Sequence, residues 1–149
     1  MLNVDLLAYQ SLLSLRTAGG KRQVWDAPRR KWLVLTPEEL VRQLCLHYLV
    51  ALGFSKNLMR TELGITVNGL QKRCDIVVFD TQTKPFLLVE CKRAKVAMTD
   101  AVLYQALDYN LQLKVPFCLI TNGLQTHLFA LDYENMAWRA CEISELGIG

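Results

Sequence analysis

The chain has 149 residues, of which 52% are hydrophobic and 21% charged, and its net charge is +3. This length and composition predict one compact α/β domain over residues 1–149 and exclude a disordered chain. No apolar run reaches the 18 residues of a membrane span and no secretion signal opens the sequence, so we expect a cytoplasmic protein that does not contact a membrane.

The first 35 residues are expected to form an extension of short strands. Segments 12–17, 23–26 and 31–35 have strand-like composition and are separated by Gly19-Gly20 and by Pro28, although residues 5–15 are also compatible with a helix. Basic side chains gather in this extension, where they either form an ordinary solvated surface or contact a phosphate backbone. They are Lys21, Arg22, Arg29, Arg30 and Lys31.

A helix is predicted to begin after Thr36. Thr36 is a good N-cap, Pro37 suits the first helical position, and Glu39 lies where the acid of a capping box lies. Apolar residues then recur at helical spacing as far as Leu52, and Gly53 ends the pattern. Glu39 keeps two interpretations: we prefer helix capping as its main role, and a contribution to catalysis is the alternative.

Two hairpins are predicted to follow this helix. Residues 59–67 have the composition of a strand, and Asn68-Gly69 is a strong hairpin signal before the next strand, which contains Asp75. A short turn then leads to a strand over residues 86–92. Three antiparallel strands in succession are therefore expected.

The second hairpin brings acidic residues together. Pairing backward from Asp80 and Pro85 places Asp75 opposite Glu90, with Cβ atoms about 5 Å apart, and Lys92 projects from the same face. Facing carboxylates repel each other, and a divalent cation such as Mg²⁺ resolves the conflict. The alternative is a pair of strand-end acids in solvent, and a slip of the register by one residue would separate the pair.

The remaining elements complete an α/β order. Thr99 or Asp100 begins a second helix that runs to about Leu113, and strands are expected at residues 117–121, 125–131 and 137–143. Five scattered cysteines without a C-x-x-C pair and two histidines do not predict a zinc site, so we expect reduced, mostly buried thiols. The order helix, three strands, helix, strand predicts an αβββαβ core over residues 36–132, with an edge strand and tail over residues 133–149.

Asp75 and the triplet Glu90-Cys91-Lys92 resemble the PD-(D/E)xK nuclease signature. Residues 73–95 are similar to the N-terminal nuclease domain of the R (motor) subunit of type I restriction enzymes, and the resemblance extends from about Val24 to Asp132. It implies a restriction-endonuclease-like fold with a central mixed sheet flanked by helices. One residue departs from the signature: Cys74 stands in place of a proline that contributes backbone shape and no ligand.

Two further segments carry the resemblance. They are residues 36–43 and the Gln105-x-x-x-Tyr109 element, which those enzymes share with RecB-like nucleases. The resemblance implies that Gln105 reaches toward the site and that Tyr109 contacts the substrate or braces the cleft. The structural alternatives are a polar surface residue for Gln105 and a half-buried Tyr109 packed on the sheet.

Two main hypotheses for function follow. The first is a metal-dependent nuclease that hydrolyses phosphodiester bonds, with DNA preferred as substrate and Mg²⁺ (or Mn²⁺) as cofactor. The second is a nuclease-fold module that binds nucleic acid or a protein partner without cutting. A structural protein without a ligand ranks last. No G-x-x-x-x-G-K-[ST] loop or separate DNA-reading motif is present, so we expect a homodimer or a partner that delivers the substrate.

Under the nuclease hypothesis each candidate residue has a role. The metal ligands are Asp75, Glu90 and the backbone carbonyl of Cys91. The catalytic residues are Asp75, Glu90, Lys92, Gln105 and Glu39, with Lys92 positioning the attacking water. The substrate-binding residues are Tyr109, Arg93, Lys95 and Arg73.

Overall fold

The computed structural model describes residues 1–67, 69–132 and 134–148, and the side chains of Val67, Leu70, Tyr109 and Gln112 lie outside the described part. Asn68, at the predicted hairpin turn, is also outside it. Two α-helices, three 3-10 helices and nine strands are found in the described residues. In chain order they are η1 (Leu6–Leu12), β1 (Leu15–Ala18), β2 (Lys21–Asp26), β3 (Lys31–Val34), α1 (Pro37–Leu52), η2 (Lys56–Leu58), β4 (Met59–Val67), β5 (Leu70–Phe79), β6 (Pro85–Cys91), α2 (Asp100–Leu113), β7 (Phe117–Thr121), β8 (Thr126–Asp132), β9 (Ala137–Ala140) and η3 (Ile143–Leu146).

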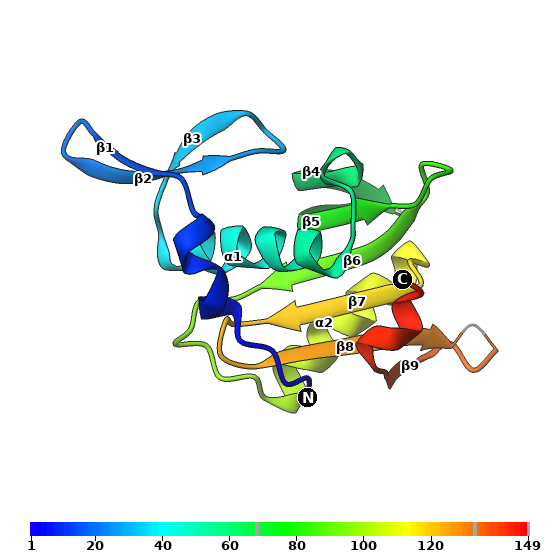
Figure 1. The fold of residues 1–149 in the computed structure, drawn as a ribbon. Coiled ribbons are helices and arrows are strands. Elements are labelled where there is room, and N and C mark those ends of the chain that lie inside the picture. Colours follow the sequence, from blue (N-terminus) through cyan, green and yellow to red (C-terminus); the bar gives the residue numbers. More distant parts are fainter. Residues whose placement is uncertain (68, 133, 149) are drawn as a thin grey trace.

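A six-stranded sheet forms the centre of the molecule, with the strand order β4-β5-β6-β7-β8-β9. Only β6 and β7 run parallel, because α2 connects them as a crossover; the other neighbours are antiparallel. The helix α1 lies on one face and α2 on the other (Figure 1). The predicted α/β fold and its αβββαβ order are confirmed.

Each face of the sheet has its own apolar core. On the α1 side, Leu44 and Leu49 pack with Ile76 and Val89, and on the α2 side Leu107 packs in a smaller cluster. All five cysteines are free and buried, as expected from their scattered positions. Among the described residues, no helix is long and apolar enough to cross a membrane.

The helix α1 begins and ends where the sequence predicted. The Thr36 hydroxyl accepts a hydrogen bond from the Glu39 amide at 3.1 Å, Pro37 is the first helical residue, and Gly53 ends the helix in the left-handed conformation at φ 113°. The other half of the capping box is not made, because the Glu39 carboxylate turns to the side chains of Arg42 and Gln43.

The register of the hairpin β5–β6 is close to the prediction. Ile76 pairs with Val89, as the predicted pairing requires. The predicted pairing of Asp80 with Pro85 is wrong: the register shifts after Val78, and Phe79 pairs with Pro85. The physical reason is that the Asp80 carboxylate accepts the amides of Gln82 and Lys84 and so belongs to the turn.

A separate three-stranded sheet, β1-β2-β3, lies at the N-terminal end of α1 (Figure 1). The strand expected at residues 12–17 is shorter, because the carboxylate of Asp5 accepts the Leu7 amide and starts η1 over the preceding residues. At the other end of the chain, the strand expected at residues 137–143 ends at Ala140. There the Glu142 amide donates to the Glu145 carboxylate and starts η3.

Candidate active site

The strands β5 and β6 separate at Asp75. Their ladder ends at the pair Ile76–Val89, and the Cys91 amide donates to Asp75 Oδ2 at 2.8 Å. Because the N–H and C=O of one residue point to the same edge of a strand, the Cys91 carbonyl faces this gap too. Residues two apart in a strand normally lie on the same face of the sheet. Cys74 and Ile76 pack on opposite faces, so the regular alternation of side chains breaks at Asp75. The Asp75 carboxylate therefore occupies the space where the next backbone pair would form.

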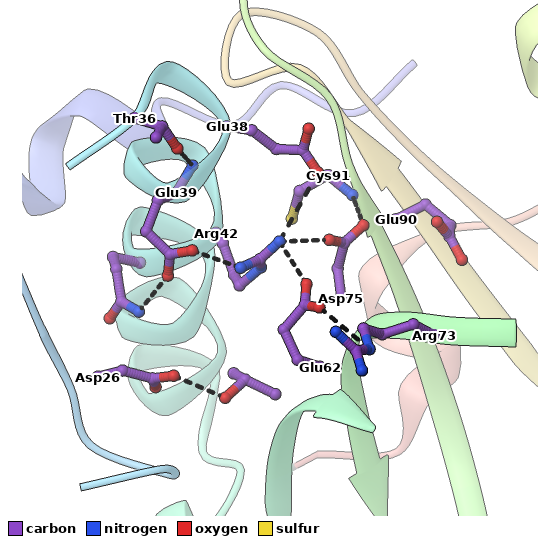
Figure 2. Close-up of polar contacts among 12 residues, drawn as sticks. Asp26, Thr36, Glu38, Glu39, Arg42, Glu62, Arg73, Asp75, Glu90 and Cys91 are labelled. Atoms are coloured by element: carbon purple, nitrogen blue, oxygen red, sulfur yellow. Dashed lines mark hydrogen bonds and ion pairs between the residues drawn. The ribbon is translucent and has the colours of Figure 1, made fainter. Parts of the chain in front are cut away.

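Arg42 of α1 is the central cation beside Asp75. Its guanidinium lies 2.8 Å from Asp75 Oδ1 and 2.7 Å from Glu62, and it also binds Glu39. Glu38 is 3.6 Å away. Figure 2 shows the guanidinium between these carboxylates. Burial opposes its charge, but the hydrogen bond to Asp75 and the neighbouring carboxylates raise the pKa of Arg42.

Glu62 of β4 joins this cluster through an unusual backbone. Its φ is 53°, in the left-handed region that a residue with a long side chain rarely adopts. The flanking pairs Thr61–Ile76 and Leu63–Cys74 are formed, and Glu62 itself is not among the paired residues. Such strain persists only where the surroundings hold it, and it concentrates at functional sites. Here it accompanies the ion pair between Glu62 and Arg42.

Glu90 faces the α2 side of the sheet. Its carboxylate lies 2.5 Å from Lys72 Nζ, and Lys72 also donates to Asn110 of α2 at 3.2 Å. Burial raises the pKa of Glu90, Lys72 and Lys92 oppose the shift, and Asp75 adds to it. The expected pairing of Asp75 with Glu90 across one face is not formed, because the ladder ends at Ile76–Val89. Both carboxylates are buried, but Asp75 binds Arg42 of α1 and Glu90 binds Lys72 on the α2 side.

Lys92 directly follows β6 and is half-buried. Its amide donates to the Thr121 carbonyl at 2.8 Å, which fixes the backbone at this point. Its charge lowers the pKa of Glu38 and Glu90, whereas Asp75 raises both, and burial raises the pKa of Glu38 most. Asp75 and Lys92 therefore act in opposite directions on the pKa of Glu90.

Four other residues predicted for the site are exposed to solvent. Arg73 is 74% exposed and lies 3.6 Å from Glu62. Arg93 and Lys95 are exposed in the loop after β6, and Gln105 is exposed on α2. No contact within the described part of the chain joins Gln105 to Asp75 or Glu90. The helix α2 contributes Asn110 instead. The side chain of Tyr109 lies outside the described residues.

Sequence reasoning missed four residues of this site: Arg42, Glu62, Lys72 and Asn110. Arg42 carried the best signal, since it follows Glu38 and Glu39 by four and three residues and must share their helix face. Nothing in the spacing of Glu62, Lys72 or Asn110 ties them to the predicted acids. Their contacts arise only when the strands and α2 are packed together.

The oxygen atoms at the gap suit a hard cation. Among the described residues no group of three or more His, Cys, Asp or Glu side chains is placed to hold a metal. The predicted set, however, needs only two carboxylates and a backbone carbonyl, and Mg²⁺ keeps several waters as further ligands. Asp75 uses two acceptor positions, for Arg42 and Cys91, of about four that a carboxylate offers. Carboxylate and carbonyl oxygens are the ligand type that Mg²⁺ takes, so the chemistry of this donor set suits the ion.

The αβββαβ core, with an acid where the central strands separate, defines an α/β nuclease-like fold. The profile of the family described as Type I restriction enzyme R protein N terminus matches residues 37–146. The chain belongs to this family, which confirms the resemblance seen in the sequence. The comparison with curated proteins finds no significant match. The matched region begins at the first residue of α1 and extends through η3.

Proposed function

We propose that this domain is a metal-dependent nuclease that hydrolyses phosphodiester bonds of DNA. The observation that carries the proposal is the separation of β5 and β6 at Asp75. It leaves a buried carboxylate and the Cys91 carbonyl facing the gap, and Cys91 lies between Glu90 and Lys92 in the chain. Membership of a restriction-enzyme family supports the same reaction and the choice of DNA.

Asp75, Glu90 and the Cys91 carbonyl would hold Mg²⁺ or Mn²⁺. When bound, the ion supplies positive charge to the scissile phosphate and to the leaving oxygen. Arg42 balances the charge of Asp75 in the structure described here.

The chain's own side chains would do the remaining work. Lys92, which directly follows β6, would orient the attacking water and donate hydrogen bonds to the phosphate. Gln105 and Glu39 would assist from the two helices. The exposed cations Arg73, Arg93 and Lys95 would bind the DNA backbone, together with Tyr109.

Cleavage of a supercoiled plasmid tests this proposal. The wild type is expected to nick the plasmid with Mg²⁺ or Mn²⁺ and to stop when chelator is added. Asp75→Asn and Lys92→Ala should lower the rate by on the order of 100-fold or more, as loss of a catalytic group does. Asp100→Asn and Lys84→Ala, which change exposed residues of the same types, should cut normally. Equal cleavage by all variants would identify a contaminating nuclease.

A second candidate is a module that binds DNA or a protein partner without cutting. The ion pair between Arg42 and Asp75 favours this binding module, because Arg42 balances the charge of the Asp75 carboxylate without a metal. A restriction enzyme contains further subunits, and one of them, or a second copy of this chain, would then deliver the substrate. Tight DNA binding that chelator does not change, with no nicking, would favour this candidate over the nuclease.

A further inference from the structure

A groove lies between the N-terminal sheet and α1. It has a volume of about 630 Å³, and β2, the β2–β3 turn, α1, η2 and the start of β4 line it. Asp75, Glu90 and Lys92 are not among its lining residues. The groove is therefore a feature distinct from the candidate active site.

The lining of this groove is basic. It contains Arg30, Lys56 and Arg60 together with His47, and no Asp or Glu among the described residues that form it. None of the three cations forms an ion pair with a carboxylate within the described part of the chain. This contrasts with Arg42, which four carboxylates surround. Like charges gathered without acids attract an anion.

Arg60 and Lys56 keep hydrogen-bond donors that are available to a ligand. Arg60 donates to the carbonyls of Asn57 and Met59 through Nη1 alone, which leaves the other donors of its fork. Lys56 is exposed and lies close enough to His47 to oppose its protonation. A phosphate group would relieve this repulsion.

An aromatic ring completes the lining. Trp25 contributes to the groove wall and is fixed by an edge-to-face contact with Trp32, with ring centroids 5.5 Å apart. A fixed aromatic ring beside cations is the combination that holds single-stranded nucleic acids, since bases stack on the ring and phosphates meet the cations. The volume lies within the range of small-molecule sites.

We propose that this groove binds a phosphorylated nucleoside, either as a free nucleotide or as a unit of a single nucleic-acid strand. The base stacks on Trp25, and Arg30, Lys56 and Arg60 bind the phosphate. The groove is separate from the carboxylates that would cut DNA, so this binding needs neither a metal nor Asp75.

Fluorescence anisotropy with the full chain in the presence of chelator tests the proposal. The probe is a labelled deoxyadenosine strand of about 12 nucleotides, a length within the usual range of single-strand sites. The double variant with Arg30→Ala and Lys56→Ala should bind on the order of 10-fold more weakly. The slope of log affinity against log salt concentration should also become about 1.4 less negative in this variant, because two phosphate contacts are lost.

A matched control removes one lysine and one arginine of the same sheet that lie outside the groove. The variant with Lys21→Ala and Arg22→Ala, at the end of β2 away from the β2–β3 turn, should keep the wild-type affinity within about 2-fold, since distant exposed charges are screened. Competition by deoxyadenosine monophosphate would identify a free nucleotide as the ligand, whereas binding of the strand alone would identify a single strand.

Absence of binding by both probes, or equal loss in the two double variants when both unfold like the wild type, would overturn the proposal. The result is independent of the nuclease proposal, because chelator removes the metal and none of Asp75, Glu90 and Lys92 lines the groove. Normal binding without plasmid cleavage would contradict only the nuclease proposal.

Discussion

Arg42 carries most of the charge balance at the candidate site. It is 6% exposed and contacts carboxylates from α1, β4 and β5. A buried cation of this kind does not stabilise a fold much more than an apolar group would, but removing it leaves the acids buried without compensation. The side chain thus ties three elements together around Asp75.

Arg42→Ala should lower the free energy of unfolding by about 3–5 kcal/mol, because Asp75, Glu39 and Glu62 lose their common partner. Urea denaturation followed by tryptophan fluorescence measures the effect. Arg139→Ala is the comparison, since Arg139 forms an exposed ion pair with Glu145 and its loss should have little effect. A loss from Arg42→Ala as small as that from Arg139→Ala would show that Arg42 is not the group that balances the acids.

The acids themselves could be found from the sequence, and their cations could not. Asp75 and Glu90 follow from strand composition and from a register that holds at Ile76 and Val89. Arg42 and Lys72 depend on how α1 and the strands pack, which no local spacing encodes. The backbone of Glu62 is beyond prediction for another reason: its left-handed φ goes against the preference of the residue and is held by tertiary contacts.

At the scale of elements, prediction succeeded where the chain marks its own boundaries. Thr36, Pro37 and Gly53 delimit α1, and Thr99 caps α2 through the amide of Val102. The predicted register was wrong where a side chain competes with the backbone for hydrogen bonds. Asp80 takes part in a turn and ends the regular register of the hairpin.

His47, on α1, should make the stability of the fold depend on pH. Burial, and next the charge of Lys56, lower its pKa below the ordinary 6.5. The unfolded chain therefore binds the proton more readily, so the contribution of His47 to stability is complete above about pH 6.5 and is lost as the pH falls below it. Unfolding free energies measured between about pH 7 and pH 5 should decline less for His47→Gln than for the wild type.

His127→Gln is the matched variant, because burial and the N-terminal charge also lower the pKa of His127. Each substitution should remove part of the pH dependence, and the double variant should remove more than either. If His47→Gln kept the whole of the wild-type dependence, His47 would not be the group that responds.

At the scale of the whole molecule, the N-terminal segment is part of the fold. The family match begins at Pro37. Leu6 nevertheless is fully buried, and it packs in the same cluster as Leu44 and Leu49 of α1. The segment before the matched region thus covers α1 and helps to build the groove beside it.

Leu6→Ala should lower the free energy of unfolding by about 2–5 kcal/mol, because it leaves a cavity against α1. Leu12→Ala at the end of η1 is the control, since Leu12 is 55% exposed and should lose little. Thermal or urea unfolding of the two variants provides the comparison. Similar stability for both would mean that the segment only rests on the surface of the core.

The nuclease proposal depends on a divalent ion in the gap between β5 and β6. Anomalous diffraction from crystals soaked in Mn²⁺ locates such an ion directly. We expect a peak contacted by Asp75, Glu90 and the Cys91 carbonyl in the wild type, and its loss in Asp75→Asn crystals. A fully soaked crystal without density at the gap, or with the ion bound by other residues, would contradict the proposed site.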